Sequence, residues 1–386
     1  MASSGTIEKR GTGTYRLEIS DGVDNNGKRI KYRKTIKAKN DGEARKALAL
    51  FVAEIEKGQY VDCKQFTVND LITKWLKTYS SSLAPKTLWR YKIMLDNRIQ
   101  PQLGHIKLRN LKPLHLIDFY NHLQANGARF DGKEEGLSAK TILHHHRLLS
   151  VIFRNGVEWG LLPFNPCDKV KPPKVQRKEA SHYDQDEVRQ LFQMLESEPL
   201  KYKAIVVLTI ASGLRRGEIM GLTWSDINLV EKTINVRQTS QYISGLGTFT
   251  KAPKNTTSKR MISISDFAVK VLLEYKENQE KNKEVLGNKW NESGMVFTQD
   301  TGEPMHPDTI SQWFPQFIRR HNLPPLTFHQ LRHTNATLLI ASGMDIRSVS
   351  ARLGHANTST TLNIYAHVLK SADKEAADKL DNMFSS

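Results

Sequence analysis

The sequence predicts a multidomain protein with three parts: a small basic module of strands and one helix, a mainly helical domain, and a larger α+β domain. The length of 386 residues favours two or three domains. The spacing of apolar residues changes along the chain from the two-residue repeat of strands to the helical repeat, and then to a mixture of both. Residues 167–181 are polar and basic and contain Pro172 and Pro173, which is typical of an interdomain linker.

The N-terminal module is predicted to contain a β-hairpin followed by a helix. Residues 14–20 (TYRLEIS) and 29–36 (RIKYRKTI) alternate in the strand period, and the segment between them, DGVDNNGK, is rich in turn-forming residues. Residues 41–58 place Ala47, Leu50, Phe51 and Ile55 at helical spacing.

Basic residues are concentrated in the second strand of this hairpin. Residues 28–39 (KRIKYRKTIKAK) contain seven Lys or Arg residues in twelve positions and no acidic residue. A solvated strand face is the simpler interpretation, but a sheet presented to a DNA groove explains the density better. The candidate DNA-binding residues are Lys28, Arg29, Lys31, Arg33, Lys34 and Lys37.

The composition points to a polyanionic partner. A formal net charge of +17 and a pI near 9.7 favour nucleic acid, because Lys and Arg contacts to phosphates release condensed counterions. We see no amphipathic anchor for a membrane surface, no apolar run near the ~20 residues needed to cross a bilayer, and no signal peptide. The two cysteines, Cys63 and Cys167, predict no disulfide framework, so a reducing cytoplasm is expected.

The helical domain begins at a capping box formed by Thr67 and Asp70, ahead of a helix with apolar residues at helical spacing. Pro85 fits the first turn of the next helix. The triplet His144–His145–His146 looks like a metal site, but consecutive residues point in different directions on a helix. We therefore expect these histidines to be structural.

Basic residues, rather than carboxylates, carry the chemical signal in the α+β domain. A metal-dependent nuclease would need clustered carboxylates, and a nucleotide-binding enzyme a glycine-rich phosphate loop, and neither is evident. Arg215 and Arg216 directly follow the helix-ending Gly213, and Glu218 could orient Arg215 or form only a structural salt bridge with it. His329 and Arg332 lie three apart, hence on one helix face.

Two further features, His355 in LGH and Tyr365 ten residues later, complete the pattern. The pair His329 and His333 could mimic a zinc site, but the metalloprotease motif needs Glu where this chain has Gln330. The motifs GLRRGE, HQLRHT, LGH and NIYAH occur in one order in one basic chain. With these motifs the sequence resembles the tyrosine recombinase (phage integrase) family. The resemblance extends over the whole chain, and the layout is similar to that of integrases of temperate phages and Gram-positive conjugative transposons.

The resemblance implies three domains. These are an arm-type DNA-binding domain over residues 1–64, built as a small three-stranded sheet plus helix; an all-α, SAM-like core-binding domain over residues 65–172; and an α+β catalytic domain over residues 173–386. It also implies a role for each matched residue. Tyr365 is the nucleophile that forms a 3′-phosphotyrosine, and Arg215 and Arg332 hold the non-bridging oxygens of the scissile phosphate.

The remaining roles follow from the same resemblance. His329 and His355 hydrogen-bond the phosphate. Glu218 supports the residues that contact the phosphate without contacting it itself. A lysine in a β-hairpin protonates the leaving 5′-oxygen; Lys254 is the better match and Lys251 the alternative. Neither a cofactor nor a metal is implied.

The implied function is a site-specific DNA recombinase that integrates and excises a mobile element in a bacterial cytoplasm. Its implied partners are double-stranded DNA at core and arm sites, three further copies in a homotetramer, a directionality factor and a DNA-bending protein. The stripe Ala372, Ala376, Leu380 and Phe384 would pack onto its own domain or onto a neighbouring protomer. The alternatives are a chromosome-resolving recombinase, a type IB topoisomerase-like enzyme, and a non-catalytic DNA-binding regulator.

Overall fold

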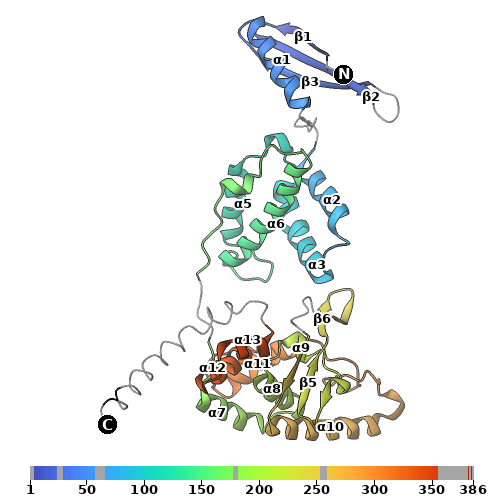
Figure 1. The fold of residues 1–386 in the computed structure, drawn as a ribbon, viewed down its shortest axis with the longest axis vertical. Coiled ribbons are helices and arrows are strands. Elements are labelled where there is room, and N and C mark those ends of the chain that lie inside the picture. Colours follow the sequence, from blue (N-terminus) through green and yellow to red (C-terminus); the bar gives the residue numbers. More distant parts are fainter. Residues whose placement is uncertain are drawn as a thin grey trace. The chain divides into compact units, whose positions relative to one another are not determined.

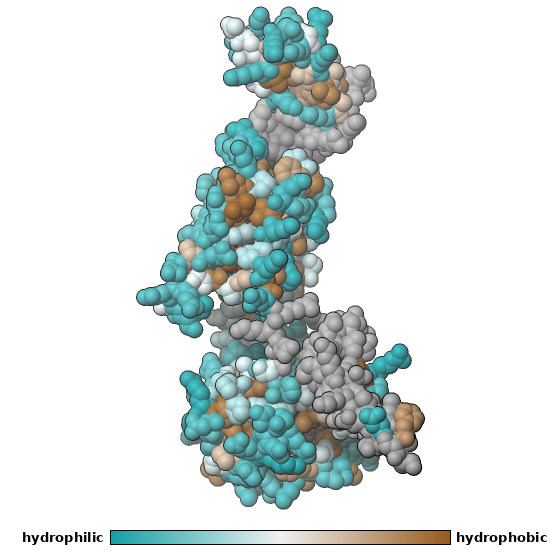
Figure 2. Space-filling model, turned by 90° about the vertical axis from the view of Figure 1, so that its left-hand side faces the viewer, coloured by the Kyte–Doolittle hydropathy of each residue, from teal (hydrophilic) through white to brown (hydrophobic). Residues whose placement is uncertain are grey.

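A computed structural model describes residues 4–23, 29–56, 66–176, 181–252 and 259–354, together with residues 381 and 384 (Figure 1). The chain divides into two compact units, residues 1–176 and 177–386. No helix in the described ranges is both long and apolar enough to cross a membrane. Hydrophilic side chains predominate on the face of the described parts that Figure 2 shows, as the high content of Lys and Arg leads one to expect.

The N-terminal part of the first unit is a three-stranded antiparallel sheet covered on one face by a helix, which confirms the predicted sheet and helix (Figure 1). Its elements are β1 (Ser4–Gly11), β2 (Thr14–Val23), β3 (Arg29–Lys37) and α1 (Asp41–Glu56). Leu17 and Ile19 of β2 pack with Phe51 and Ile55 of α1, so alternate residues of the central strand form the small core.

The rest of the first unit is helical, as predicted. Its elements are α2 (Val68–Tyr79), α3 (Pro85–Met94), the π-helical turn η1 (Leu95–Ile99), α4 (Gln100–Leu103), the 3₁₀ turn η2 (Leu108–Asn110), α5 (Pro113–Gln124), α6 (Ala139–Glu158) and the 3₁₀ turn η3 (Pro166–Lys169). The predicted capping box of Thr67 and Asp70 opens α2. Pro85 occupies the first turn of α3.

Two details differ from the simplest interpretation of the sequence. The expected linker starts later than residue 167, because Cys167 and Val170 are buried in the hydrophobic core of the helical part. The histidine triplet diverges as expected: the ring of buried His145 lies 2.9 Å from the carbonyl of Thr141, and the ring of His146 lies 2.8 Å from the hydroxyl of Tyr120. Burial raises the pKa of the Cys167 thiol to about 12, so at neutral pH this cysteine is a protonated core residue.

The second unit is an α+β domain around one large core, again as predicted. Its helices are α7 (Gln185–Leu195), α8 (Leu200–Ser212), α9 (Arg216–Ile219), α10 (Asp266–Leu286), α11 (Thr309–Arg320), α12 (Gln330–Ala341) and α13 (Ile346–Leu353), with 3₁₀ turns η4 (Trp224–Asp226) and η6 (Gly287–Lys289). One sheet has the order β4-β5-β8, from Ile227–Asn228, Thr233–Val236 and Arg260–Ser263; β6 (Thr239–Ile243) and β7 (Gly247–Lys251) form a separate hairpin.

The most buried helix of this unit is α8, which positions the site described next. Residues 204–210 of α8 are buried without interruption, so the helix is apolar on all sides. It contacts α7, α9, α10 and α12. Packing against these four helices therefore fixes the position of the C-terminal end of α8.

Candidate active site

The C-terminal end of α8 is set by Gly213, which has the left-handed φ of +66° and caps the helix. A Cβ atom at this position would lie 2.5 Å from Oδ1 of Asn335 and 2.7 Å from Cδ2 of Leu353. Glycine is thus required twice, for the backbone conformation and for the close approach of α12 and α13. The same residue places Arg215 beside the end of α13.

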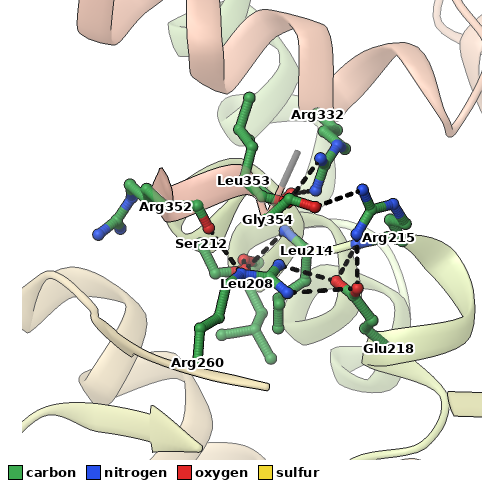
Figure 3. A network of polar contacts seen from close by, with 11 residues as sticks. Leu208, Ser212, Leu214, Arg215, Glu218, Arg260, Arg332, Arg352, Leu353 and Gly354 are labelled. Atoms are coloured by element: carbon green, nitrogen blue, oxygen red, sulfur yellow. Dashed lines mark hydrogen bonds and ion pairs between the residues drawn. The ribbon is translucent and has the colours of Figure 1, made fainter. Parts of the chain in front are cut away.

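Arg215 contacts one acceptor three residues away, Glu218, and one that is 139 residues away, Gly354 (Figure 3). Its Nη1 donates to Oε1 of Glu218 at 2.8 Å, and its Nη2 donates to the carbonyl of Gly354 at 3.0 Å. The backbone N–H of Arg215 also donates to Oε2 of Glu218, at 3.0 Å. The contact expected between Arg215 and Glu218 is therefore present, and the Arg215 side chain remains 37% exposed.

Arg332, the second arginine of the pattern, joins the ends of α8 and α13. Its Nη1 donates to the carbonyl of Gly213 at 2.6 Å, and its Nη2 donates to the carbonyl of Leu353 at 2.7 Å. The residue is 3% exposed. Arg332 therefore has a structural role that the sequence pattern did not reveal, in addition to any role toward a ligand.

Two further arginines, Arg260 and Arg352, belong to this network but were not predicted (Figure 3). Arg260 donates from Nε to the carbonyl of Arg352 at 2.7 Å and from Nη2 to Oε2 of Glu218 at 2.9 Å. Arg352 donates from Nη2 to the carbonyls of Ala211 and Ser263, both at 2.8 Å. The sequence held a signal for Arg260: it shares a strand face with the apolar Ile262 and Ile264.

Four guanidinium groups thus surround the C-terminal ends of two helices. The carboxylate of Glu218 pairs with two of them, Arg215 and Arg260. Burial would raise the pKa of Glu218, but the hydrogen bond and charge of Arg260, followed by those of Arg215, outweigh burial and hold this pKa below its ordinary value. Most other contacts are to backbone carbonyls, where the helix dipoles favour positive charge. The site therefore has an excess of positive charge suited to an anion.

His329 lies immediately before α12 and is partly exposed. The pKa of His329 is lowered by partial burial of the ring and then by the positive charges of Arg332, Arg215 and Arg216. His333, one turn further along α12, packs edge-on against it, with ring centroids 5.5 Å apart. At neutral pH His329 is therefore a neutral imidazole, which can donate one hydrogen bond and accept another.

Arg216, in contrast, points to a different part of the domain. Its Nη1 lies 2.6 Å from Oδ1 of Asp308 and donates to the hydroxyl of Ser311 at 2.7 Å. The polar contacts of Arg216 are thus with Asp308 and Ser311, whereas those of Arg215 are with Glu218 and Gly354. No group of three or more His, Cys, Asp or Glu residues suited to a metal ion occurs in the described ranges.

Several predicted site residues lie outside the described residues, namely Lys28, Lys254, His355 and Tyr365. The long C-terminal range of described residues begins at residue 259, five positions beyond Lys254, and ends at Gly354, directly before His355. Lys251, the alternative lysine, is the last residue of β7.

The candidate DNA-binding residues of β3 divide between the two faces of the N-terminal sheet. Lys31 and Arg33 lie opposite Ser20 and Glu18 of β2, and both form ion pairs with Glu18, at 2.9 Å and 2.7 Å. Alternation along β3 places the exposed residues Arg29 and Lys37 with this set. Lys34 pairs instead with Leu17 in the register, donates to Glu54 of α1 at 3.0 Å and lies over the ring of Phe51.

Comparison with known proteins agrees with the order of the arginine, histidine and tyrosine motifs. A family model described as the phage integrase family matches residues 182–372, a range that includes the positions of His355 and Tyr365. A second model, the phage integrase N-terminal SAM-like domain, matches residues 67–124. Together they cover more than half of the chain. The chain belongs to the tyrosine recombinase (phage integrase) family. This recombinase is therefore a DNA strand-transferring enzyme.

Several curated proteins and solved structures resemble this recombinase. A tyrosine recombinase XerC-like protein of Caldanaerobacter subterraneus is 29% identical over the full length of both chains. The ICEBs1 integrase of Bacillus subtilis is 27% identical, over 98% of this chain and all of its own. The Tn1549 transposon integrase in complex with a circular intermediate DNA shares the fold at a TM-score of 0.69 and 20% identity, over 82% of this chain and all of its own.

Proposed function

We propose that this recombinase integrates and excises a mobile element by site-specific strand cleavage and rejoining. The observation that carries the proposal is the cluster of arginines at the ends of α8 and α13, where Arg215 is held by Glu218 and Gly354 yet remains partly exposed. Guanidinium groups fixed in advance can stabilise the charge that develops on a phosphate in the transition state. The names of the ICEBs1 and Tn1549 relatives support the mobile-element assignment.

In the proposed reaction, Tyr365 attacks the scissile phosphate and becomes a 3′-phosphotyrosine, releasing a 5′-hydroxyl. Arg215 and Arg332 hold the non-bridging oxygens, and His329 and His355 hydrogen-bond the phosphate. Lys254 donates the proton to the leaving 5′-oxygen. A free tyrosine has a pKa of ~10, so nearby positive charge is needed to favour the developing phenolate.

The covalent intermediate makes the exchange of strands possible without an external energy source. The phosphotyrosine bond retains the energy of the phosphodiester, and the 5′-hydroxyl of a second DNA molecule can attack it and release Tyr365. The guanidinium groups and the lysine supply the charge stabilisation and the proton, so we propose a reaction independent of metal and cofactor.

The domain roles form part of the same proposal. Residues 1–64 bind arm-type sites, residues 65–172 bind the core site, and residues 173–386 carry out catalysis. The active species is a homotetramer on DNA, assisted by a directionality factor and a DNA-bending protein, in the cytoplasm of a bacterial host. The open face of the N-terminal sheet, with Arg29, Lys31, Arg33 and Lys37, supports the first of these roles.

A suicide substrate tests the reaction. A core-site duplex nicked beside the scissile phosphate loses its short 5′-hydroxyl fragment after cleavage, so the covalent adduct accumulates. We expect wild type to form a protein–DNA adduct, Tyr365→Phe to form none, and Tyr202→Phe, which keeps its ring stacked on Trp313, to match wild type. An adduct that persists in Tyr365→Phe contradicts the nucleophile assignment.

The same assay separates the recombinase from its alternatives. Addition of a second duplex with a free 5′-hydroxyl should yield a joined product containing strands from both DNA molecules. Relaxation of supercoiled DNA without such a product would indicate a topoisomerase-like activity, and the absence of any adduct with wild type would indicate a DNA-binding regulator.

A further inference from the structure

Arg260 is a buried arginine that the reaction proposed above does not use directly. It is the first residue of β8, and its side chain is 8% exposed. Alternation along the strand places it on the inward face with Ile262 and Ile264. A guanidinium this deeply buried needs a specific set of acceptors to offset its loss of hydration.

The acceptors of Arg260 are related to those of Arg215 (Figure 3). Arg215 is oriented by Glu218 and by the carbonyl of Gly354. Arg260 donates to the same carboxylate from Nη1 at 3.3 Å and from Nη2 at 2.9 Å, and its Nε donates to the carbonyl of Arg352, two residues before Gly354. A single guanidinium therefore holds both the carboxylate and the turn on which the geometry of Arg215 depends.

The turn itself is built around Arg260. Gly354 has a φ of +65°, and a Cβ atom there would lie 2.9 Å from Nη1 of Arg260. A side chain at this position would therefore displace the guanidinium of Arg260. The position of Arg260 and the conformation of the α13 end are consequently linked.

We propose that Arg260 is a positioning residue for strand cleavage, which holds the Arg215 guanidinium in the orientation that contacts the scissile phosphate. The inference rests on the function proposed above and adds a residue to it. Arg260 acts through Glu218 and the Arg352–Gly354 turn and does not touch DNA. Lysine cannot replace it, because one ammonium group cannot reproduce the planar fork that reaches a carboxylate and a carbonyl in two directions.

The test uses full-length Arg260→Lys, which keeps the charge and removes the fork. Single-turnover cleavage is measured on the nicked core substrate with either an ordinary phosphodiester or a methylphosphonate at the scissile position. The methylphosphonate replaces a charged non-bridging oxygen by a neutral methyl group, so cleavage of this substrate depends less on a correctly aimed guanidinium. Arg215→Lys serves as the reference for direct loss of the clamp.

We expect Arg260→Lys to slow cleavage of the phosphodiester about 10- to 100-fold, less than the loss expected for removing a direct transition-state donor. On the methylphosphonate, its rate should fall within about threefold of wild type, and Arg215→Lys should show the same selective recovery. Arg237→Lys is the matched control, because Arg237 pairs with Asp226 in the same unit but is 51% exposed and lies outside the network. It should leave both rates unchanged.

The ratio of the two rates does not depend on the fraction of folded enzyme, so partial unfolding of Arg260→Lys cannot imitate the result. Equal slowing on both substrates, or no slowing on either, overturns the positioning role. A wild-type enzyme that forms a Tyr365-dependent adduct while Arg260→Lys behaves in either of these ways would refute this inference and leave the proposed function intact.

Discussion

Gly354 both ends α13 and contacts two arginines of the site. Its φ of +65° is a left-handed conformation that ends α13, its carbonyl accepts from Arg215, and its α-carbon faces the guanidinium of Arg260. A glycine here is therefore required by more than the helix cap. The cap alone would tolerate asparagine, for example, whereas a side chain here would also have to displace the guanidinium of Arg260.

We predict that Gly354→Ala is more harmful than the same change at Gly343. Both glycines have positive φ, +65° and +89°, but a Cβ atom at Gly343 meets nothing within 4 Å. Gly343→Ala should cost about 1 kcal/mol of unfolding free energy from backbone strain alone. Gly354→Ala should cost about 2–4 kcal/mol, because Arg260 must also move away from its charged partner.

Urea denaturation of the two variants measures the difference, and cleavage of the nicked substrate shows whether it reaches the active site. Equal losses of stability at the two positions would mean that Arg260 moves aside at no cost. The close approach would then not constrain the site.

At the scale of elements, the site is an assembly of chain segments that are remote in sequence. Arg215 and Gly354 are 139 residues apart, and Arg332 and Gly213 are 119 apart. The sequence pattern identified Arg215 and Arg332 because their residue types and order resemble a known family. It could not show that each also holds a backbone carbonyl, because a carbonyl has no residue type and its partner is set by tertiary packing.

The N-terminal sheet shows a similar limit. The strand β2 and its partner β3 were predicted from their alternation, whereas β1 has few large apolar residues (Ser4–Gly11, SGTIEKRG) and the pattern alone did not reveal it. Strand alternation places Lys34 on the face opposite Lys31 and Arg33. The high density of Lys and Arg in β3 nevertheless grouped all three as candidate DNA-binding residues. The structure therefore places Lys31 and Arg33 on the open face of the sheet and Lys34 in contact with α1.

This division leads to a prediction about β3. Lys31 and Arg33 lie on the open face, so Lys31→Ala with Arg33→Ala should weaken DNA binding and lower the slope of log affinity against log salt by about 2, the value for two lost phosphate contacts. The ammonium of Lys34 pairs with Glu54 of α1, so Lys34→Ala should leave the slope unchanged. Titration of a fluorescent mixed-sequence duplex at several KCl concentrations gives both slopes.

An unchanged slope in the double variant would indicate that Glu18, which pairs with both side chains, neutralises them also in the complex. An equal effect of Lys34→Ala would indicate that general charge, and not the open face, governs binding.

At the scale of the whole molecule, the order of the parts could be predicted because each part has its own hydrophobic pattern. The apolar cluster around Leu17, Ile19, Phe51 and Ile55 is made only of residues from the N-terminal module. The helical part has its own cluster from Val68 to Val170. Because the N-terminal module has its own hydrophobic core, its removal exposes no part of the core of the helical part. The domain roles proposed above can therefore be tested by deletion.

We predict that a chain starting at residue 65 cleaves the nicked core substrate at a rate within about threefold of the full chain, since every residue of the arginine network lies in residues 177–386. The same chain should fail to integrate DNA whose attachment site includes arm sequences, because the basic face of β3 is lost. The full-length double variant Lys31→Ala with Arg33→Ala is the control for this second effect: it should also reduce integration while leaving cleavage intact. Loss of core cleavage in the shortened chain, with its helical and α+β parts still folded by circular dichroism, would assign the N-terminal module to the core site and contradict the proposed domain roles.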